Sequence, residues 1–293
     1  MKTIKLFLSL LVVLVLTSCE DVIQVKLDQG EPLVTIDAFI NDMPKTQTVR
    51  LTYTDNYFSQ KPNVPVTNAT VVLRDITAGV EYNFTDISNS GNYSYDPSLS
   101  TDTLGKIGHD YELTVTHQGN VFKSYSTMNR TARVDSLLIE FQEANTFGTD
   151  GEEGYRFAFL GIDPPGPVSD FFWIKSYRNG VFFNRGGDIN ICENAAFGAG
   201  ADGLIFITPV AMGITPRGEL FNKYDVCRVE IHSINEETYN FLTQVQTQTT
   251  NSGLFATSPE NVKCNITNTT SDKVKVVGWF CMSAVGFKER VAE

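Results

Sequence analysis

A series of short runs between Leu33 and Ser126 alternates apolar with polar side chains, and this pattern constrains the fold more than any other feature of the chain. In the clearest run, Asp110–Thr116, every second residue is apolar, so one face would pack while the other stays in water. His117–Asn120 then supplies a turn into the next run, which is the pattern of a β-hairpin. The runs are Leu33–Ile40, Thr48–Thr54, Ala69–Asp75, Glu81–Asp86, Gly91–Tyr95, Asp110–Thr116 and Val121–Ser126. About seven strands at this spacing predict a β-sandwich.

The order of these runs resembles a known kind of module. The segments NATVVLRD, YNFTD, GNYSY, GHDYELTV and GNVFKSYST follow one another as in small transthyretin-like or immunoglobulin-like modules, a resemblance that implies a spacer or a docking surface. The alternation breaks at Asn129–Arg133, where two arginines interrupt it. We therefore expect an N-terminal transthyretin-like or immunoglobulin-like β-sandwich over residues 33–130 and a second domain over residues 131–293.

The second domain is expected to be β-rich with one clear α-helix, which makes the predicted fold class mainly β. Ser233 and Glu236 fit the Ser-x-x-Glu capping box, and apolar residues then recur at three-residue intervals up to Val245. This pattern predicts a helix near residues 234–249. Strand patterns occur at Val134–Phe141, Arg156–Ile162, Phe171–Tyr177, Val181–Asn184 and Asp225–Ile231, and again at Asn261–Ile266 and Lys273–Phe287.

Residues 1–18 have the layout of a secretory signal peptide, with lysines before an apolar stretch and small residues after it. The apolar stretch, Leu6–Leu16, is shorter than the about 20 residues that a transmembrane helix needs. The segment LTSC that ends at Cys19 resembles a bacterial lipobox, so Cys19 is the expected site of lipidation. Residues 19–32 would then form a lipidated tether, because two or more acyl chains anchor a protein stably to a membrane.

The acids Glu20 and Asp21 resemble those that follow the lipidated cysteine in surface-exported lipoproteins of the Bacteroidota. We therefore expect a lipid-anchored protein of the outer membrane, at the cell surface rather than on the periplasmic face. The formal net charge of −11 excludes nucleic acid as an expected partner, because an acidic chain is repelled by phosphates.

Besides Cys19, the chain has the cysteines Cys192, Cys227, Cys264 and Cys281, all in the second domain. In an exported chain they can form two disulfides, for which three pairings are open. The alternative is that they are free thiols buried in the core. No Cys-x-x-Cys spacing supports a zinc site.

We expect no enzymatic activity, no metal site and no cofactor apart from the lipid on Cys19. The sequence contains neither a Gly-x-Ser-x-Gly elbow, a His-Glu-x-x-His motif nor a phosphate-binding loop. His109 and His117 lie on one predicted strand, about 27 Å apart, so they cannot share a site. The acidic loop Ala144–Gly154 could bind calcium, but it lacks the EF-hand spacing and a solvated loop is preferred.

The aromatic segment DFFWIKSYRNGVFF contains Trp173, a candidate ligand-facing residue. Aromatic faces can stack on sugar rings, so one interpretation is a glycan-binding site. The alternation of the segment also fits a strand that is covered on both faces, which assigns Trp173 to the core instead.

The order of features along nearly the whole chain after the signal peptide resembles one family. The segments VTIDAFIND, VRLTYTDNYF, VTNATVVLRD, SINEETYNFL, ENVKCNIT and VVGWFCMSA resemble the Bacteroidota outer-membrane lipoprotein family catalogued as domain of unknown function 4249. Members are often encoded beside TonB-dependent transporters, which implies an accessory or binding role and supplies no catalytic residue. We therefore expect a non-catalytic outer-membrane lipoprotein that serves a TonB-dependent transporter or another membrane assembly. The alternative is a surface lipoprotein that binds glycan or peptide alone.

Overall fold

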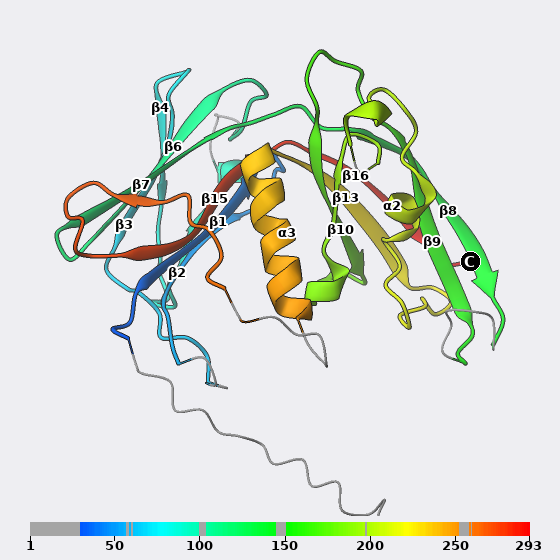
Figure 1. The fold of residues 1–293 in the computed structure, drawn as a ribbon, viewed down its shortest axis with the longest axis horizontal. Helices are drawn as coiled ribbons and strands as arrows, with labels where there is room; N and C mark the ends of the chain where they lie inside the picture. The colour runs from blue at the N-terminus through cyan, green and yellow to red at the C-terminus, as the bar shows by residue number, and fades with distance from the viewer. Residues whose placement is uncertain are drawn as a thin grey trace, which may run out of the picture. The chain divides into compact units, whose positions relative to one another are not determined.

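The computed structural model describes residues 30–56, 59, 61–99, 104–144, 151–196, 198–251, 258 and 260–293. Cys19, the predicted signal peptide and residues 19–29 of the predicted tether lie outside these ranges. The described chain is mainly β, and its longest helix is α3 (Glu236–Thr250) (Figure 1). The predicted fold class is thus confirmed.

Two sheets build an N-terminal β-sandwich, one with the strand order β15-β1-β2-β5 and the other with the order β14-β7-β6-β3-β4. The strands of the first sheet are β1 (Val34–Asn41), β2 (Gln47–Tyr53), β5 (Asn92–Tyr95) and β15 (Val276–Ser283). The strands of the second are β3 (Thr70–Asp75), β4 (Val80–Phe84), β6 (Asp110–His117), β7 (Asn120–Thr127) and β14 (Thr267–Asn268).

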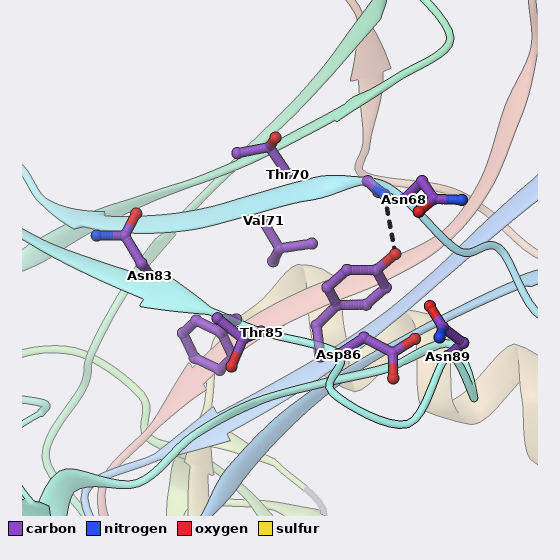
Figure 2. A pocket seen from close by; sticks show the side chains of 10 residues that line it. Asn68, Thr70, Val71, Asn83, Thr85, Asp86 and Asn89 are labelled. Carbon is purple, nitrogen blue, oxygen red and sulfur yellow. Dashed lines mark hydrogen bonds between the residues drawn. The ribbon is translucent and has the colours of Figure 1, made fainter.

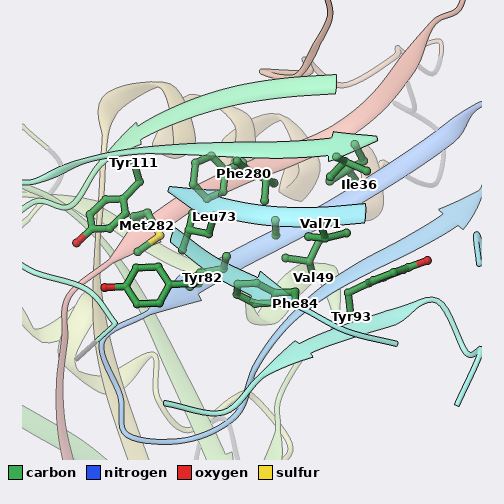
Figure 3. Packing of buried hydrophobic residues seen from close by; sticks show 14 of the residues in the cluster. Ile36, Val49, Val71, Leu73, Tyr82, Phe84, Tyr93, Tyr111, Phe280 and Met282 are labelled. Atoms are coloured by element: carbon green, nitrogen blue, oxygen red, sulfur yellow. The ribbon is translucent and has the colours of Figure 1, made fainter. Parts of the chain in front are cut away.

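The apolar residues of the alternating runs form one core between these sheets. Figure 3 shows Ile36 of β1, Leu73 of β3, Tyr111 of β6 and Phe280 of β15 within the same cluster, and all four are essentially inaccessible to solvent. Each fully buried apolar side chain of this size stabilises the fold by about 1.5–3 kcal/mol. The alternation seen in the sequence therefore identifies the buried face of β6 correctly.

The strand β15 belongs to the N-terminal sandwich although it lies near the end of the chain. It runs parallel to β1, with Val34 opposite Val276 and Asn41 opposite Ser283. The two backbones are so close at Gly278 (φ +126°) that an added Cβ would overlap the carbonyl oxygen of Ile36. The strand pairing therefore differs from the predicted division at residue 130, since β14 and β15 return to the first sandwich.

The rest of the chain forms a second set of sheets. One has the order β11-β10-β13-β16, with β12 also paired to β10, and the other is the β8–β9 hairpin. The strands are β8 (Arg133–Gln142), β9 (Gly154–Ile162), β10 (Phe171–Arg178), β11 (Val181–Phe182), β12 (Asn190–Glu193), β13 (Val226–Ile234) and β16 (Val285–Val291). The helix α2 (Thr208–Met212) joins their common core, and 3-10 helices lie at Pro97–Leu99, Gly186–Asp188 and Ala199–Ala201.

The N-terminus of α3 differs from the predicted capping box. Asn235 is the N-cap residue, and its side-chain oxygen accepts a hydrogen bond from the Thr238 amide at 2.8 Å. Ser233 is buried in β13 instead, where its hydroxyl donates to the Asn129 carbonyl and accepts from the Ala284 amide. Because the Ser233 hydroxyl is engaged in these tertiary contacts, it does not cap the helix, and Asn235 does so.

A single residue, Ala284, separates β15 from β16 and carries the chain from one set of sheets to the other. The Ser233 amide donates to the Ala284 carbonyl at 3.0 Å, and the Val285 amide donates to the Asp42 carboxylate at 3.0 Å. Because these bonds hold the backbone on both sides of the crossing, the two sets of sheets are connected through residues that are distant in sequence.

In the structure Cys192, Cys227, Cys264 and Cys281 are free thiols, the second of the two states that the sequence leaves open, and all except Cys264 are buried. Cys192 lies opposite Phe172 of β10, and Cys227 lies opposite Arg178 on the other side of the same strand. Six residues of a strand extend about 20 Å, far beyond the Cα separation of a disulfide. Burial raises the pKa of the Cys227 thiol to about 12, so this thiol is also unreactive.

We expect a thiol reagent such as N-ethylmaleimide to modify Cys264 in the native protein and to leave Cys192, Cys227 and Cys281 unmodified. All four should react after unfolding in urea without any reductant. Peptide mapping by mass spectrometry measures both states. A pair of disulfide-linked peptides in a non-reduced digest of the exported protein would contradict this expectation.

Candidate functional site

Trp173 lies on one face of the sheet built by β10 and β13, together with five ionisable residues of these two strands. Strand pairing places Trp173 opposite His232, Lys175 opposite Glu230, and Tyr177 opposite Arg228. We call this set the charged face, and it consists of Trp173, Lys175, Tyr177, Arg228, Glu230 and His232. The opposite face of the same strands packs into the core with β8 and β9.

Glu230 is the centre of the charged face, with a side chain that is 1% exposed. Its carboxylate accepts hydrogen bonds from Arg228 Nε at 2.8 Å, Tyr177 Oη at 2.9 Å and His232 Nε2 at 2.9 Å, and the Lys45 ammonium lies at 3.5 Å. Burial by itself would raise the pKa of Glu230, but these hydrogen bonds and the nearby positive charges lower it well below its usual value. Burial also lowers the pKa of His232 to about 3, so at pH 7 the imidazole is a neutral donor.

The Lys175 ammonium lies in an aromatic environment. It is 3.8 Å from the ring centroid of Trp173 and 5.8 Å from those of Phe39 and Phe182. No side chain or carbonyl in the described ranges accepts a hydrogen bond from it. Burial lowers the pKa of Lys175 to about 8.

The Trp173 ring packs against other side chains of the protein. Besides the Lys175 ammonium, it contacts Phe39 of β1 edge to face, with ring centroids 5.2 Å apart. Trp173 lines neither of the two pockets described below. The geometry therefore favours the second interpretation of the aromatic segment, in which the strand is covered on both faces. It favours less the first, in which the indole ring is presented to a sugar.

A polar pocket of about 330 Å³ lies beside β3 and β4 of the sandwich (Figure 2). The Tyr93 hydroxyl accepts from the Ala69 amide and donates to the Val66 carbonyl, so it is occupied in the structure. The Asp86 carboxylate accepts from the amides of Ser90 and Gly91 and holds the following turn. The polar side chains that remain at the rim are Thr70, Asn83, Thr85 and Asn89. They could bind a polar ligand, but the buried Tyr93 offers no ring face for stacking.

A larger, apolar groove of about 580 Å³ runs over the β8–β9 hairpin toward α2. It is lined by both strands of the hairpin and by residues of the segment 205–212. Leu138 is 48% exposed and Ile205 is 61% exposed, and Ile162 beside them is 50% exposed. We call this surface the hairpin groove. This surface was not predicted from the sequence, although the run VDSLLIEF carries apolar residues on both faces of its strand.

Asp163 holds the segment that forms one side of the hairpin groove. Its amide donates to the Leu204 carbonyl at 3.0 Å, and its Oδ2 accepts from the Gly203 amide at 3.1 Å. Its Oδ1 is buried without a hydrogen-bond partner. Burial raises the pKa of Asp163 to about 6, and the charges of Asp170 and Asp202 add to this effect.

The described residues offer no evidence for a metal centre or for a spanning helix. Among them, no three histidine, cysteine or acidic side chains come together in a group that could hold a metal ion. None of their helices has the length and apolar character needed to span a bilayer. Three candidate surfaces remain in the described part of the chain: the charged face, the polar pocket and the hairpin groove.

The comparison with known families assigns nearly the whole chain to one family. The family model described as "Domain of unknown function (DUF4249)" matches residues 20–289, so the chain belongs to this family. No curated protein matches it.

We expect Glu230→Gln to lower the free energy of unfolding by about 3 kcal/mol at pH 7, because it removes the buried carboxylate charge to which Arg228, Tyr177 and His232 donate hydrogen bonds. Urea unfolding of both proteins measures this difference in free energy.

The difference should depend on pH. Since the pKa of Glu230 is lowered in the folded state, the contribution of its charge to stability is present above the unfolded pKa, near 4.5, and is lost as the pH falls. The difference from the wild type should therefore shrink below pH 4.5. The control Glu289→Gln, at a carboxylate that is 51% exposed, should change the stability by less than about 0.5 kcal/mol.

We expect Asp163→Asn to raise the free energy of unfolding at pH 7 by about 2 kcal/mol. The pKa of Asp163 is about 6 in the folded state against 3.8 for an ordinary aspartate, so the wild type loses stability as the pH rises from about 4 to about 6. Asparagine keeps the acceptor for the Gly203 amide but carries no charge. Unfolding curves between pH 3.5 and pH 7.5 should show a gain that disappears at the acid end, and equal stability at pH 7 would contradict this expectation.

Proposed function

We propose that this member of the DUF4249 family is a non-catalytic lipoprotein of the outer membrane that acts as an accessory or binding subunit of a membrane assembly, such as a TonB-dependent transporter. The observation that carries the proposal is the hairpin groove. Contiguous exposed apolar surface is uncommon on a protein that works alone, and it marks sites of interaction with other proteins or membranes.

The N-terminal sequence supports the membrane part of the proposal. A lipid on Cys19 would restrict the protein to the membrane surface, where it meets an integral partner at high effective concentration. The chain after Glu20 and Asp21 would then face the cell surface.

Two features of the described chain support a binding role rather than catalysis. The buried carboxylate Glu230 is engaged by four neighbouring side chains, and the His232 imidazole donates to it, so neither is available to a substrate. The three histidines belong to separate contacts, since His109 pairs with Asp75 and His117 with Tyr53.

A second candidate function is a surface lipoprotein that binds glycan or peptide alone. The polar pocket favours it, because Thr70, Asn83 and Asn89 present hydroxyl and amide groups around a volume of about 330 Å³. Hydroxyls and amides of this kind provide orientation and specificity in small-molecule sites. The hairpin groove is larger and more apolar than this pocket, so we place the accessory function first.

We expect tagged protein, extracted from native membranes in mild detergent, to carry one integral membrane protein at a near-equal amount, as quantified by mass spectrometry. Ile205→Asp should reduce the recovered partner at least about tenfold, because a buried charge at an apolar contact is strongly unfavourable. Ile87→Asp is the matched control, since Ile87 is 92% exposed and lies in the sandwich away from the groove. Cys19→Ala should release the protein from the membrane fraction.

Recovery of the lipoprotein without a partner would contradict the accessory function. Binding on a glycan array that is lost on Asn83→Ala would then establish the second candidate.

A further inference from the structure

Asp163 connects the end of β9 to the segment 203–206, which forms one side of the hairpin groove. Its amide and its Oδ2 each bind the backbone of this segment, as described above. In addition, the Phe206 amide donates to the Gly161 carbonyl of β9 at 3.2 Å. We call the contacts of Gly161 and Asp163 with residues 203–206 the Asp163 clasp. Because Ile205 and Phe206 line the hairpin groove, the clasp holds that side of the groove in place.

The Asp163 side chain is fully buried, and no cation pairs with it directly. Its Oδ2 accepts from one backbone amide, whereas its Oδ1 has no hydrogen-bond partner among the described residues. The Arg130 guanidinium lies in the same region, but it donates to the Asp170 carboxylate and to the carbonyls of Pro164 and Pro165. An ionised carboxylate is costly in this setting, because burial removes it from solvent and no bound charge offsets the loss.

The other ionisable groups around Asp163 do not compensate its charge. Burial is the main cause of its raised pKa, and the charges of Asp170 and Asp202 raise it further, whereas the positive charge of Arg130 lowers it. The Cys192 thiol of β12 also interacts with it electrostatically, and burial raises the pKa of this thiol so that it stays neutral. With a pKa of about 6, the Asp163 carboxyl changes its charge between acidic and neutral pH.

The charge of Asp163 therefore biases the clasp. When the segment 203–206 leaves β9, the carboxyl reaches water and its pKa returns to the ordinary value, 3.8. The closed clasp thus binds a proton more tightly than the open one, and closure must weaken as the pH rises from about 4 to about 6. The two pKa values correspond to a change of about 100-fold in the ratio of open to closed clasp over this range.

We propose that Asp163 is a pH-sensitive switch for the hairpin groove: its protonated carboxyl holds the segment 203–206 against β9, and its ionisation favours release of this segment. The closed clasp presents Ile205 and Phe206 as one side of the groove, and the open clasp removes them. Acidic conditions therefore favour the intact groove. The inference rests on the proposed function, in which the groove contacts a partner, and it makes that contact dependent on pH.

Hydrogen exchange of single amides in the full-length protein tests the proposal at about pH 5 and about pH 7.5, after correction for the intrinsic effect of pH on exchange. We expect the protection of the Gly203 and Phe206 amides to fall about tenfold from the lower to the higher pH, because the closed clasp loses about this factor between them. The amide of Val229, in the centre of β13, should exchange more slowly at both pH values, since the clasp opens without unfolding of the sheet.

Two variants separate the charge of Asp163 from other effects of pH. Asp163→Asn keeps an acceptor for the Gly203 amide but does not ionise, so the protection of the clasp amides should change less than about twofold between the two pH values. Asp202→Asn is the matched control, because it removes an exposed acid of the same region and leaves Asp163 able to ionise. The dependence on pH should persist in this variant.

Three results would overturn the proposal: protection of the clasp amides that does not change with pH in the wild type, a dependence on pH that persists in Asp163→Asn, or clasp amides that exchange as slowly as Val229. The last result would mean that the clasp opens only when the whole sheet unfolds. Because the measurement needs no partner, it can fail while the partner recovery described above succeeds. Absence of a partner together with the expected exchange would refute the proposed function alone.

Discussion

The parallel pair of β1 and β15 is the constraint on which the rest of the structure depends. The pair joins strands from opposite ends of the chain, and Gly278 permits the close approach of the two backbones. The entropy of closing so long a loop grows only slowly with its length, so the pairing is affordable once both strands bury their apolar side chains. It also places Ala284, and therefore β16, at the edge of the second sheet. The C-terminal segment thus closes both sets of sheets.

The charged face shows how the second sheet accommodates ionisable groups away from solvent. Glu230 is the shared acceptor, and its neighbours Arg228, Tyr177 and His232 come from the same two strands. Lys45 reaches it from the turn after β1. A buried carboxylate with this many donors is stable as an ion. The loss of any one donor would leave the desolvation cost of the carboxylate less fully offset by hydrogen bonds. The network therefore couples the first sandwich to the second sheet.

The hairpin groove gathers apolar side chains of the β8–β9 hairpin and of the segment 205–212 on one surface. Leu138 and Ile205 are exposed there, and such apolar surface gains free energy when it leaves water. Asp163 holds one side of the groove with an unpaired carboxylate oxygen.

The sequence by itself determined the local elements of this protein. The alternation of Asp110–Thr116 identified a strand and its buried face, and the periodicity up to Val245 identified α3, because both patterns follow from backbone geometry over a few residues. Only the tertiary structure decided which strands are neighbours. The segment of β15 is apolar on both faces, so its sequence is equally compatible with several partners, and its return to β1 could not be predicted. The sequence likewise left open whether the four cysteines are bonded, whereas the structure shows that β10 separates Cys192 from Cys227. The hairpin groove depends on what the rest of the chain leaves uncovered, which is a property of the packed molecule and not of any single segment.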